Sequence, residues 1–205
     1  MQPFTRLSAL VCPLPLPNVD TDQLIPARFM KRTRAQGYGE QLMHDLRRNP
    51  DGTLRTDFPP NDPARSGAQI LVARRNFGGG SSREAAAYAL VDGGFRCVLA
   101  PSFGDIFSSN AVNNGLLPAR IGEAEAEHLL DLLAAGLREL TVDLETCTVT
   151  AGNEVLPFTV APTWRTKLLN GWDDIDLTLS HRAAIEAFAT ARAAAHPWTL
   201  PTRPA

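Results

Sequence analysis

Cysteine is scarce in this chain of 205 residues, and the few cysteines form no pattern. Cys12, Cys97 and Cys147 are an odd number of widely spaced residues, and no two of them form a C-x-x-C pair. Disulfide frameworks and cysteine metal sites are recognised by even numbers and by close, regular spacing. We therefore expect neither a disulfide framework nor a metal site that belongs to this chain.

A large charge of one sign and long apolar runs are also lacking. The net charge is −2, so no broad basic field predicts binding to nucleic acid or to a membrane surface. No apolar run is long enough to span a bilayer. The N-terminal stretch contains prolines and no charged leader, which argues against a signal peptide and favours a cytoplasmic location. The hydrophobic content of 44% suits one compact domain over residues 1–205, or one domain with an appendage.

The most regular part of the chain predicts a βαβ unit. Residues 68–74 and 95–100 are continuous apolar runs of strand length, and an alanine-rich, helix-forming segment lies between them. Gly93 and Gly94 are typical of the end of that helix. The two strands are therefore expected to be parallel, with a right-handed crossover.

Further elements extend this unit into an α/β fold with a mixed sheet, a βαβ core and flanking helices. The pattern predicts a strand at 5–12, a short helix after 18, a helix within 102–115, a strand at 116–121, a helix within 123–136, strands at 139–145, 146–151 and 154–160, and helices at about 163–170 and 180–195. One face of the helix within 123–136 carries Ala126, Leu129, Leu130 and Leu133. Gly152 and Asn153 predict a hairpin turn.

The segment from residue 32 to residue 66 has no clear periodicity. It is rich in Arg, Asp, Gly and Pro, and only residues 37–48 have a composition compatible with a helix. Loops of this length in compact domains are usually functional or disordered. We expect a flexible, functional loop here.

A glycine-rich loop joins the first strand of the βαβ unit to its helix and reads NFGGGSSRE from Asn76 to Glu84. Ser81 and Glu84 fit a capping box at the start of the helix. The N-terminus of a helix attracts anions, yet Arg83 places a cation there, which suggests a bound carboxylate or phosphate. A purely structural turn, in which the serine is a cap, explains the pattern equally well.

The loop does not match the better-known motifs of similar composition. It lacks the G-x-G-x-x-G spacing of dinucleotide-binding turns, the G-K-[ST] of a P-loop and the G-x-S-x-G of a nucleophile elbow. No histidine stands beside the serines, so the sequence predicts no Ser–His pair in this loop.

Four segments resemble known motifs, in the same order, along nearly the whole chain. NVDTDQLIPARF (18–29), NFGGGSSREAAAYAL (76–90) and PSFGDIFSSNAVNNGLLP (101–118) are similar to motifs of the swivelling domain of the aconitase superfamily. LLNGWDDIDLTL (168–179) resembles the tail of one family, the small subunits of bacterial 3-isopropylmalate dehydratase. Four such motifs in order are far more specific than one, and they imply the swivelling β/β/α domain.

The resemblance also implies an activity. The family interconverts 2-isopropylmalate and 3-isopropylmalate through an alkene in leucine biosynthesis, and a serine of the GSSRE loop is the base. By position the base is Ser81, while Arg83, with Ser82 and Gly80, would bind the substrate. A [4Fe-4S] cluster would be held by a separate large subunit, so this chain would bind no cofactor and be inactive alone. The segment 32–66 would then be an active-site loop that becomes ordered when the large subunit docks.

Two more residues are candidates for substrate binding by this resemblance. Arg28 is a candidate for a second carboxylate-binding arginine, although a surface arginine beside a helix is equally compatible. Met30 lies where related small subunits carry substrate-selecting residues and is a candidate contact for an isopropyl group. The basic residues around it are alternatively contacts with the large subunit. The acidic segment Asp20–Asp22 looks like a metal or acid–base group, but capping of turns is the simpler expectation.

The glycine loop departs from the family pattern at four positions. Gly79 stands where cysteine is usual, Ala85 where histidine is usual, Ala87 in place of proline and Tyr88 in place of tryptophan. The usual cysteine is not a cluster ligand, so the change at Gly79 is mild, whereas the histidine would lie in the first helical turn beside Ser81. Two alternatives therefore stay open: a paralogous hydro-lyase small subunit for another substituted malate, and a non-catalytic binding subunit.

Overall fold

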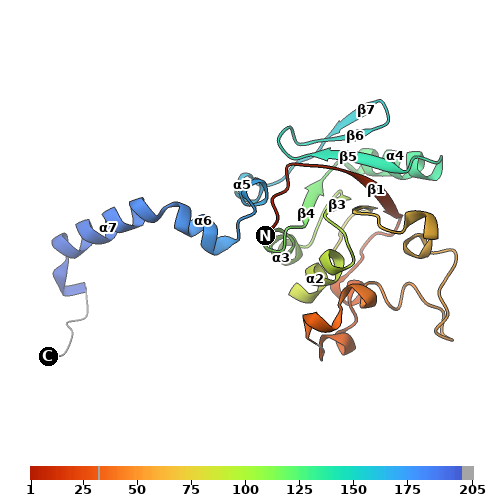
Figure 1. Ribbon diagram of the computed structural model, residues 1–205, viewed down its shortest axis with the longest axis horizontal. Coiled ribbons are helices and arrows are strands. Elements are labelled where there is room, and N and C mark those ends of the chain that lie inside the picture. The colour runs from red at the N-terminus through yellow and green to blue at the C-terminus, as the bar shows by residue number, and fades with distance from the viewer. Residues whose placement is uncertain (32, 200–205) are drawn as a thin grey trace.

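A curled sheet of seven strands organises the fold, in the order β4-β3-β2-β1-β5-β6-β7 (Figure 1). The structure is a computed structural model that describes residues 1–31 and 33–199. The long strand β1 (Arg6–Leu14) belongs to both halves of the sheet. Its first part pairs antiparallel with β5 (Glu139–Asp143), and its second part pairs parallel with β2 (Ile70–Ala73). The mixed α/β sheet predicted from the sequence is confirmed.

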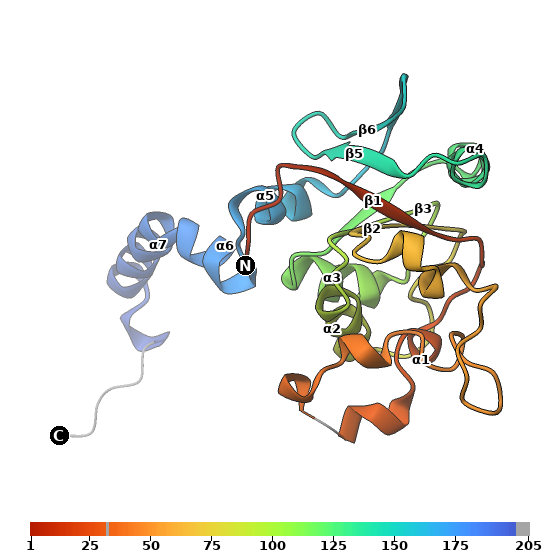
Figure 2. The same ribbon diagram turned by 45° about the vertical axis from the view of Figure 1, so that its right-hand side comes forward.

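The parallel half contains the predicted βαβ unit. β2 is followed by α2 (Glu84–Asp92), β3 (Cys97–Ala100), α3 (Asp105–Asn113) and β4 (Leu117–Arg120), and all three neighbouring strand pairs are parallel. Alternate strand residues face opposite sides, as the pleat requires. Leu71 and Val98 pack toward α2 and α3, whereas Ile70 and Leu99 pack toward α4 (Glu123–Ala134). Figure 2 shows α1 (Thr21–Leu24), α2 and α3 on one side of the sheet and α4 on the other.

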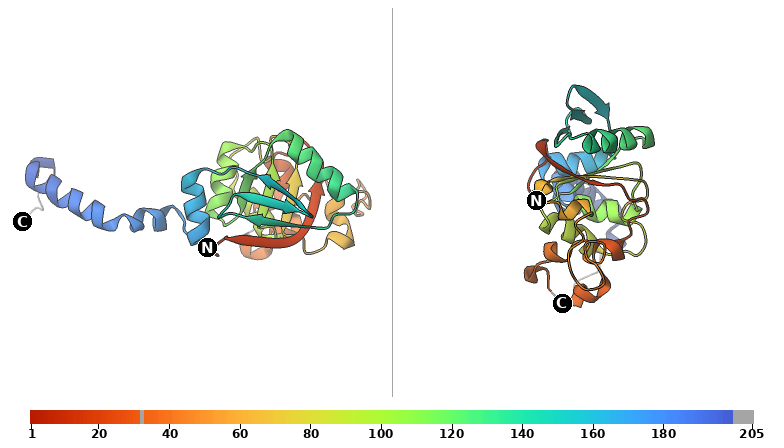
Figure 3. Two further views of the ribbon diagram at one scale, coloured as in Figure 1. Left: turned by 90° about the horizontal axis from the view of Figure 1, so that it is seen from above. Right: turned by 90° about the vertical axis from the view of Figure 1, so that its right-hand side faces the viewer.

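The antiparallel half closes the fold over α4. β5, β6 (Thr148–Ala151) and β7 (Glu154–Pro157) form a meander, with the predicted turn between β6 and β7. The four apolar residues assigned to one face of the α4 segment are all buried, which confirms the helical pattern. Backbone hydrogen bonds of 3.0 and 2.8 Å between Arg120 and Thr159 join the end of β4 to the chain after β7, so the sheet curls upon itself (Figure 3).

The segment 33–66 contains short 3₁₀ turns, η2 (Arg34–Gln36), η3 (Gly39–Gln41), η4 (Pro59–Asn61) and η5 (Pro63–Arg65), and an isolated bridge between Arg48 and Leu54. Met43 has a φ of 51°, which interrupts any helix at this point, so the helix considered for residues 37–48 does not form. Tyr38, Leu42 and Phe58 are buried and anchor the segment to the core. Arg32, the first residue of the predicted loop, lies outside the described residues.

The described part of the chain ends with two α-helices and a 3₁₀ turn that lie away from the rest of the molecule. After α5 (Pro162–Asn170) come α6 (Asp174–Ser180), α7 (Arg182–Ala195) and η6 (Pro197–Thr199). We call residues 174–199 the C-terminal arm; it projects from the body beside the N-terminus (Figure 1). The sequence predicted α7 but missed α6. Within the described part of the chain, no helix has the length and apolar character needed to cross a membrane.

Candidate active site

The glycine loop is held between two other segments of the chain. On one side, Gly78 N–H donates to Val19 O (2.7 Å), and Thr21 N–H donates to Gly79 O (3.0 Å). The hydroxyl of the buried Thr21 adds a third bond, 3.0 Å to Ser81 O. On the other side, Phe77 N–H donates to Ser102 O (3.0 Å). Three of the motifs found in the sequence therefore meet at one point.

Two of the three consecutive glycines have a physical reason to be glycine. Gly78 has a φ of +70°, and a Cβ there would clash with the ring of Phe107. Gly80 also has a positive φ, +87°, a region that side chains disfavour. Gly79 has an ordinary φ, and the atoms nearest to a Cβ there would belong to the side chain of Asn76, whose oxygen would lie 3.1 Å away. A side chain at position 79 is therefore compatible with this backbone, which explains why the glycine–cysteine difference is mild.

The capping box expected at Ser81 and Glu84 is wrong. α2 begins at Glu84, and the residue before it, Arg83, is extended (φ −134°, ψ 104°) and makes no side-chain cap. Because the loop stays extended up to Arg83, Ser81 lies too far from the helix to cap it. Ser81 and Ser82 are exposed, and among the described residues neither hydroxyl has a hydrogen-bond partner. These hydroxyls are free to contact another molecule.

The guanidinium of Arg83 is oriented by Asp22. The Arg83 side chain is only 19% exposed, and its Nη1 donates to the carboxylate of Asp22 in α1. Sequence reasoning missed this pair, because the two residues lie 61 positions apart and no local pattern connects them. The neighbouring Asp20 caps α1, as expected, by accepting from Gln23 N–H at 2.8 Å. The acidic segment thus has a structural role at Asp20 and faces the candidate site at Asp22.

The structure does not connect Arg28 to the glycine loop. Arg28 and Met30 lie on η1 (Ala27–Lys31), the turn that follows α1. The exposed guanidinium of Arg28 donates to both carboxylate oxygens of Asp45 and lies 3.2 Å from Nδ1 of His44. This bond from Arg28 lowers the pKa of Asp45 to about 2. Gly80, Ser81, Ser82 and Arg83 therefore form one group, while Arg28 is bound elsewhere and Met30 is half-buried.

Three of the departures from the family pattern, Ala85, Ala87 and Tyr88, lie on α2, and Ala87 is buried there. Ala85 is half-buried and packs against the core, so it presents no polar group to the loop. Tyr88 lies under the guanidinium of Arg34, 4.2 Å from the ring centroid, and Arg34 also donates to Asp92 at 2.7 Å. The basic segment after η1 is thus attached to α2 by cation–π and ion-pair contacts.

The cysteines do not fit an iron–sulfur cluster, which needs several thiolates around one point. Cys12 and Cys97 are buried in packing clusters on opposite faces of the sheet, and Cys147 lies in the turn between β5 and β6. Burial raises the pKa of Cys12 to about 12 and also raises that of Cys97, so both thiols keep their protons. No group of three or more His, Cys, Asp or Glu side chains with metal-binding geometry occurs in residues 1–31 and 33–199.

Comparison with known proteins decides the family. Residues 1–124 match the family model of the aconitase C-terminal domain, residues 127–162 match the LeuD_N model, and residues 174–202 match the C-terminal domain of the 3-isopropylmalate dehydratase small subunit. The 3-isopropylmalate dehydratase small subunit of Granulibacter bethesdensis is 47% identical, over 98% of this chain and 99% of that protein. The chain belongs to the family of 3-isopropylmalate dehydratase small subunits. A second member of the family, from Cytophaga hutchinsonii, is 47% identical over 92% of this chain and 94% of its own.

A solved structure confirms the fold of this family. The 3-isopropylmalate dehydratase (leuD) of Methanocaldococcus jannaschii has a TM-score of 0.61, with 24% sequence identity, and the match covers 90% of this chain and 99% of that one. At this identity the likeness shows the fold alone.

Proposed function

We propose that this chain is the small subunit of a 3-isopropylmalate dehydratase, a hydro-lyase of leucine biosynthesis that is active only with its large subunit. It interconverts 2-isopropylmalate and 3-isopropylmalate by dehydration and rehydration. The observation that carries this proposal is the exposed Ser81 hydroxyl, which has no hydrogen-bond partner among the described residues. It lies in a loop held beside the guanidinium of Arg83, which Asp22 orients, in a chain that belongs to this family.

Arg83 binds a carboxylate of the substrate in this proposal. Its planar guanidinium donates two parallel hydrogen bonds to a carboxylate, and Asp22 already shows that a carboxylate reaches it. Substrate binding thus replaces a carboxylate of the protein with a carboxylate of the substrate. The Ser82 hydroxyl and the Gly80 N–H are further donors on the same loop. Arg28 reaches a second carboxylate only if it leaves Asp45, so we rank Arg28 and Met30 below the loop residues.

Ser81 is the base. Its Oγ, as the alkoxide, takes the proton from the carbon next to the substrate carboxylate. The C–O bond of the neighbouring carbon breaks to give the alkene, and the hydroxyl group leaves as hydroxide, for which the cluster of the large subunit would supply a Lewis acid. Hydroxide then adds to the carbon that lost the proton, Ser81 returns the proton to the carbon that lost the hydroxyl group, and the alkoxide is restored. A serine alkoxide needs nearby positive charge and little water. Arg83 supplies the charge, but Ser81 is exposed, so a second chain must exclude the water.

The same reasoning assigns the remaining parts of the enzyme to the large subunit. The thiols of this chain do not fit a cluster, so we propose that the [4Fe-4S] cluster lies in the large subunit. We also propose that the segment 32–66 becomes ordered when that subunit docks and is then better protected from proteases. Limited proteolysis measures this directly: slower cleavage within 33–66 on adding the large subunit supports the proposal, and equal cleavage with and without it counts against it.

Anaerobic reconstitution tests the proposed function. The chain is co-expressed with the large subunit from the same genome, and the alkene is followed by its ultraviolet absorbance. Ser81→Ala is expected to lower kcat by about 100- to 10,000-fold, the usual contribution of a general base, without loss of complex formation. Ser8→Ala is the matched control, because Ser8 lies on β1 outside the loop and contacts Thr141, and it is expected to retain the parent kcat. Equal activity of Ser81→Ala and the parent chain would exclude Ser81 as the base.

A related substrate is the second candidate function, and the apolar Ala85 in the first turn of α2 favours testing it. A panel of 2- and 3-substituted malates separates the two functions by kcat/KM. Higher kcat/KM on another malate than on isopropylmalate would assign the chain to that substrate. A complex that turns over none of them would leave a binding subunit.

A further inference from the structure

The C-terminal arm exposes most of the large apolar side chains that lie on the surface of the described residues. Ile175 (68% exposed) and Leu179 (48%) are four residues apart on α6, and Ile185 (47%) and Phe188 (65%) are three residues apart on α7. Such spacings place each pair on one face of its helix. Trp198, 76% exposed, follows at the end of the arm. Apolar side chains gathered on one element indicate a surface that another molecule covers.

α7 also lacks the packing that normally stabilises a helix. It has 14 residues, and none of them is buried. An isolated helix of about 12–15 residues is marginal in water, because most helical stability in proteins comes from packing of an apolar face. The arm is therefore expected to gain its stability from a partner.

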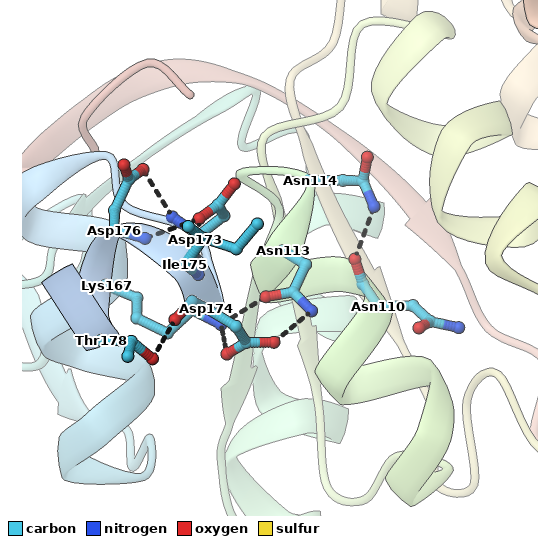
Figure 4. A network of polar contacts seen from close by, with 9 residues as sticks. All are labelled: Asn110, Asn113, Asn114, Lys167, Asp173, Asp174, Ile175, Asp176 and Thr178. Carbon is cyan, nitrogen blue, oxygen red and sulfur yellow. Dashed lines mark hydrogen bonds and ion pairs between the residues drawn. The ribbon is translucent and has the colours of Figure 1, made fainter. Parts of the chain in front are cut away.

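The base of the arm is fixed to the body by a small polar cluster (Figure 4). Lys167, at the end of α5, is only 2% exposed, and its Nζ lies 2.5 Å from Oδ1 of Asp174, the first residue of α6. Asn113, at the end of α3, contacts both: its Oδ1 accepts from Lys167, and its Nδ2 donates to Asp174 at 3.0 Å. The start of the arm is thus held at a defined place, although no residue of α6, α7 or η6 is buried.

A series of side-chain contacts links this cluster to the candidate active site. Asn114 follows Asn113, and its side-chain amide donates to Glu84 at 3.2 Å. Glu84 is the first residue of α2 and follows Arg83 directly. A partner that covers the glycine loop therefore approaches the same side of α2 and α3 on which the arm is anchored.

We propose that the C-terminal arm is a docking element for the large subunit, in which Ile185 and Phe188 enter an apolar groove of that subunit. The inference rests on the proposed function and adds the surface by which the two chains associate. The family models support this occupant: the match to the aconitase C-terminal domain ends at residue 124, whereas the arm falls in residues 174–202, which match the C-terminal domain of the 3-isopropylmalate dehydratase small subunit. A segment by which this family of small subunits is recognised is expected to serve the association of the subunits.

A membrane surface fits the arm less well. Helices that bind membrane surfaces carry many Lys and Arg residues on the polar face. From Asp174 to Ala195 the arm has three acidic residues (Asp174, Asp176, Glu186) against two basic ones (Arg182, Arg192). A protein groove, which needs only apolar contact and shape, is the better match.

The test measures binding of the full-length chain to the cluster-loaded large subunit without substrate, by calorimetry under anaerobic conditions. The double substitution Ile185→Ser with Phe188→Ser is expected to raise Kd by about 100-fold, as loss of central apolar anchors does in other interfaces. Val155→Ser is the matched control, because Val155 is 62% exposed but lies on β7 in the body. Its Kd is expected to stay within about threefold of the parent value. Unchanged thermal unfolding of the double variant excludes a folding defect, because neither side chain is buried.

Hydrogen exchange gives a second readout. Amides of residues 182–195 are expected to exchange fast in the free chain and at least about tenfold more slowly in the complex, because an unpacked helix opens easily. Parent-like binding by the double variant, or no added protection of α7, would overturn the proposal. A third outcome would also overturn it: the free parent chain dimerises, and the double variant does not dimerise but binds the large subunit as the parent does. That outcome would assign the arm to an interface with a second copy of this chain.

The design separates this inference from the proposed function. Binding and exchange are measured without substrate, so a complex that fails to turn over isopropylmalate refutes the function and leaves the docking result intact. If the double variant regains the parent kcat at high concentrations of both subunits, the arm acts in association and not in the chemistry.

Discussion

The glycine loop and the C-terminal arm are both exposed, but for opposite physical reasons. The loop is polar, and backbone hydrogen bonds to Val19, Thr21 and Ser102 hold it in place. Gly78 and Gly80 allow the positive φ angles that this path of the backbone needs. The arm is apolar on one face and is attached mainly at its base, through Lys167 and Asp174. A rigid polar surface suits chemistry, because reacting groups must be positioned before the substrate arrives. An unpacked apolar surface suits association, because burial of that surface is what drives binding.

The two regions differ also in what a mutation is expected to change. Substitutions in the loop alter either the reacting groups or the backbone that positions them, so they change kcat/KM or the free energy of unfolding. Substitutions on the exposed face of the arm leave the free energy of unfolding of the free chain unchanged and change the affinity for a partner. Variants in both regions therefore test this difference.

Arg83→Lys is expected to have the largest effect in the loop. Lysine keeps the positive charge but loses the planar pair of donors that binds a carboxylate. We expect kcat/KM of the reconstituted enzyme to fall by about 100-fold or more, since hydrogen bonds to charged groups contribute about 1.5–3 kcal/mol each. Steady-state kinetics on isopropylmalate measure this. The Kd for the large subunit is expected to stay near the parent value, and a parallel loss of binding would show that Arg83 serves the interface instead.

Gly78→Ala is expected to destabilise the body, and Gly79→Ala is its neighbouring control. At Gly78 a methyl group meets the ring of Phe107 and a positive φ, which together cost about 2–5 kcal/mol. At Gly79 the backbone is ordinary, so the change is expected to stay within about 0.5 kcal/mol. Urea unfolding of the free chain measures both. Equal stability of the two variants would mean that the loop is not fixed as the glycines indicate.

The sequence predicts the body better than it predicts the surroundings of the site. Apolar periodicity is local, so it gave the strands at 68–74 and 95–100 and the buried face of α4 correctly. It also located the GSSRE loop between β2 and α2. The contact between Asp22 and Arg83 depends on the packing of α1 against the loop, which no local pattern encodes.

The errors at helix starts have local causes. The Ser81–Glu84 spacing is correct for a capping box, but the loop is pulled into an extended path by its bonds to Val19 and Thr21, so tertiary structure overrides the propensity. α6 was missed because seven residues are too few for a clear period. Asp173, which caps the N–H groups of Ile175 and Asp176, was the available signal.

Asp174→Ala is expected to weaken the anchor of the arm. The substitution leaves the ammonium of the buried Lys167 without its carboxylate, which costs about 1–3 kcal/mol in the free energy of unfolding. Lys167 and Asn113 also lower the pKa of Asp174, so the carboxylate stays charged below its ordinary range. Lys167→Met in the Asp174→Ala background is expected to restore part of the loss, because it removes the unpaired charge. Urea unfolding of the two single variants and of the double variant measures the coupling between Asp174 and Lys167. Additive losses in the free energy of unfolding would show that the two groups do not interact.

Arg28→Gln is expected to have the smallest effect, and it separates Arg28 from the loop arginine. The bond from Arg28 holds the pKa of Asp45 at about 2, below the value of about 3.9 in an unfolded chain. A carboxyl group with a lowered pKa stabilises the folded state above about pH 4, and that stabilisation is lost as the pH falls from about 4 to about 2. Both side chains are more than half exposed, so the pair contributes less than about 1 kcal/mol. An NMR titration of Asp45 in Arg28→Gln is expected to show its pKa rising toward the ordinary value, with the parent stability at pH 7 nearly retained. If kcat/KM fell as far as in Arg83→Lys, Arg28 would have to leave Asp45 in the complex and bind the second carboxylate of the substrate.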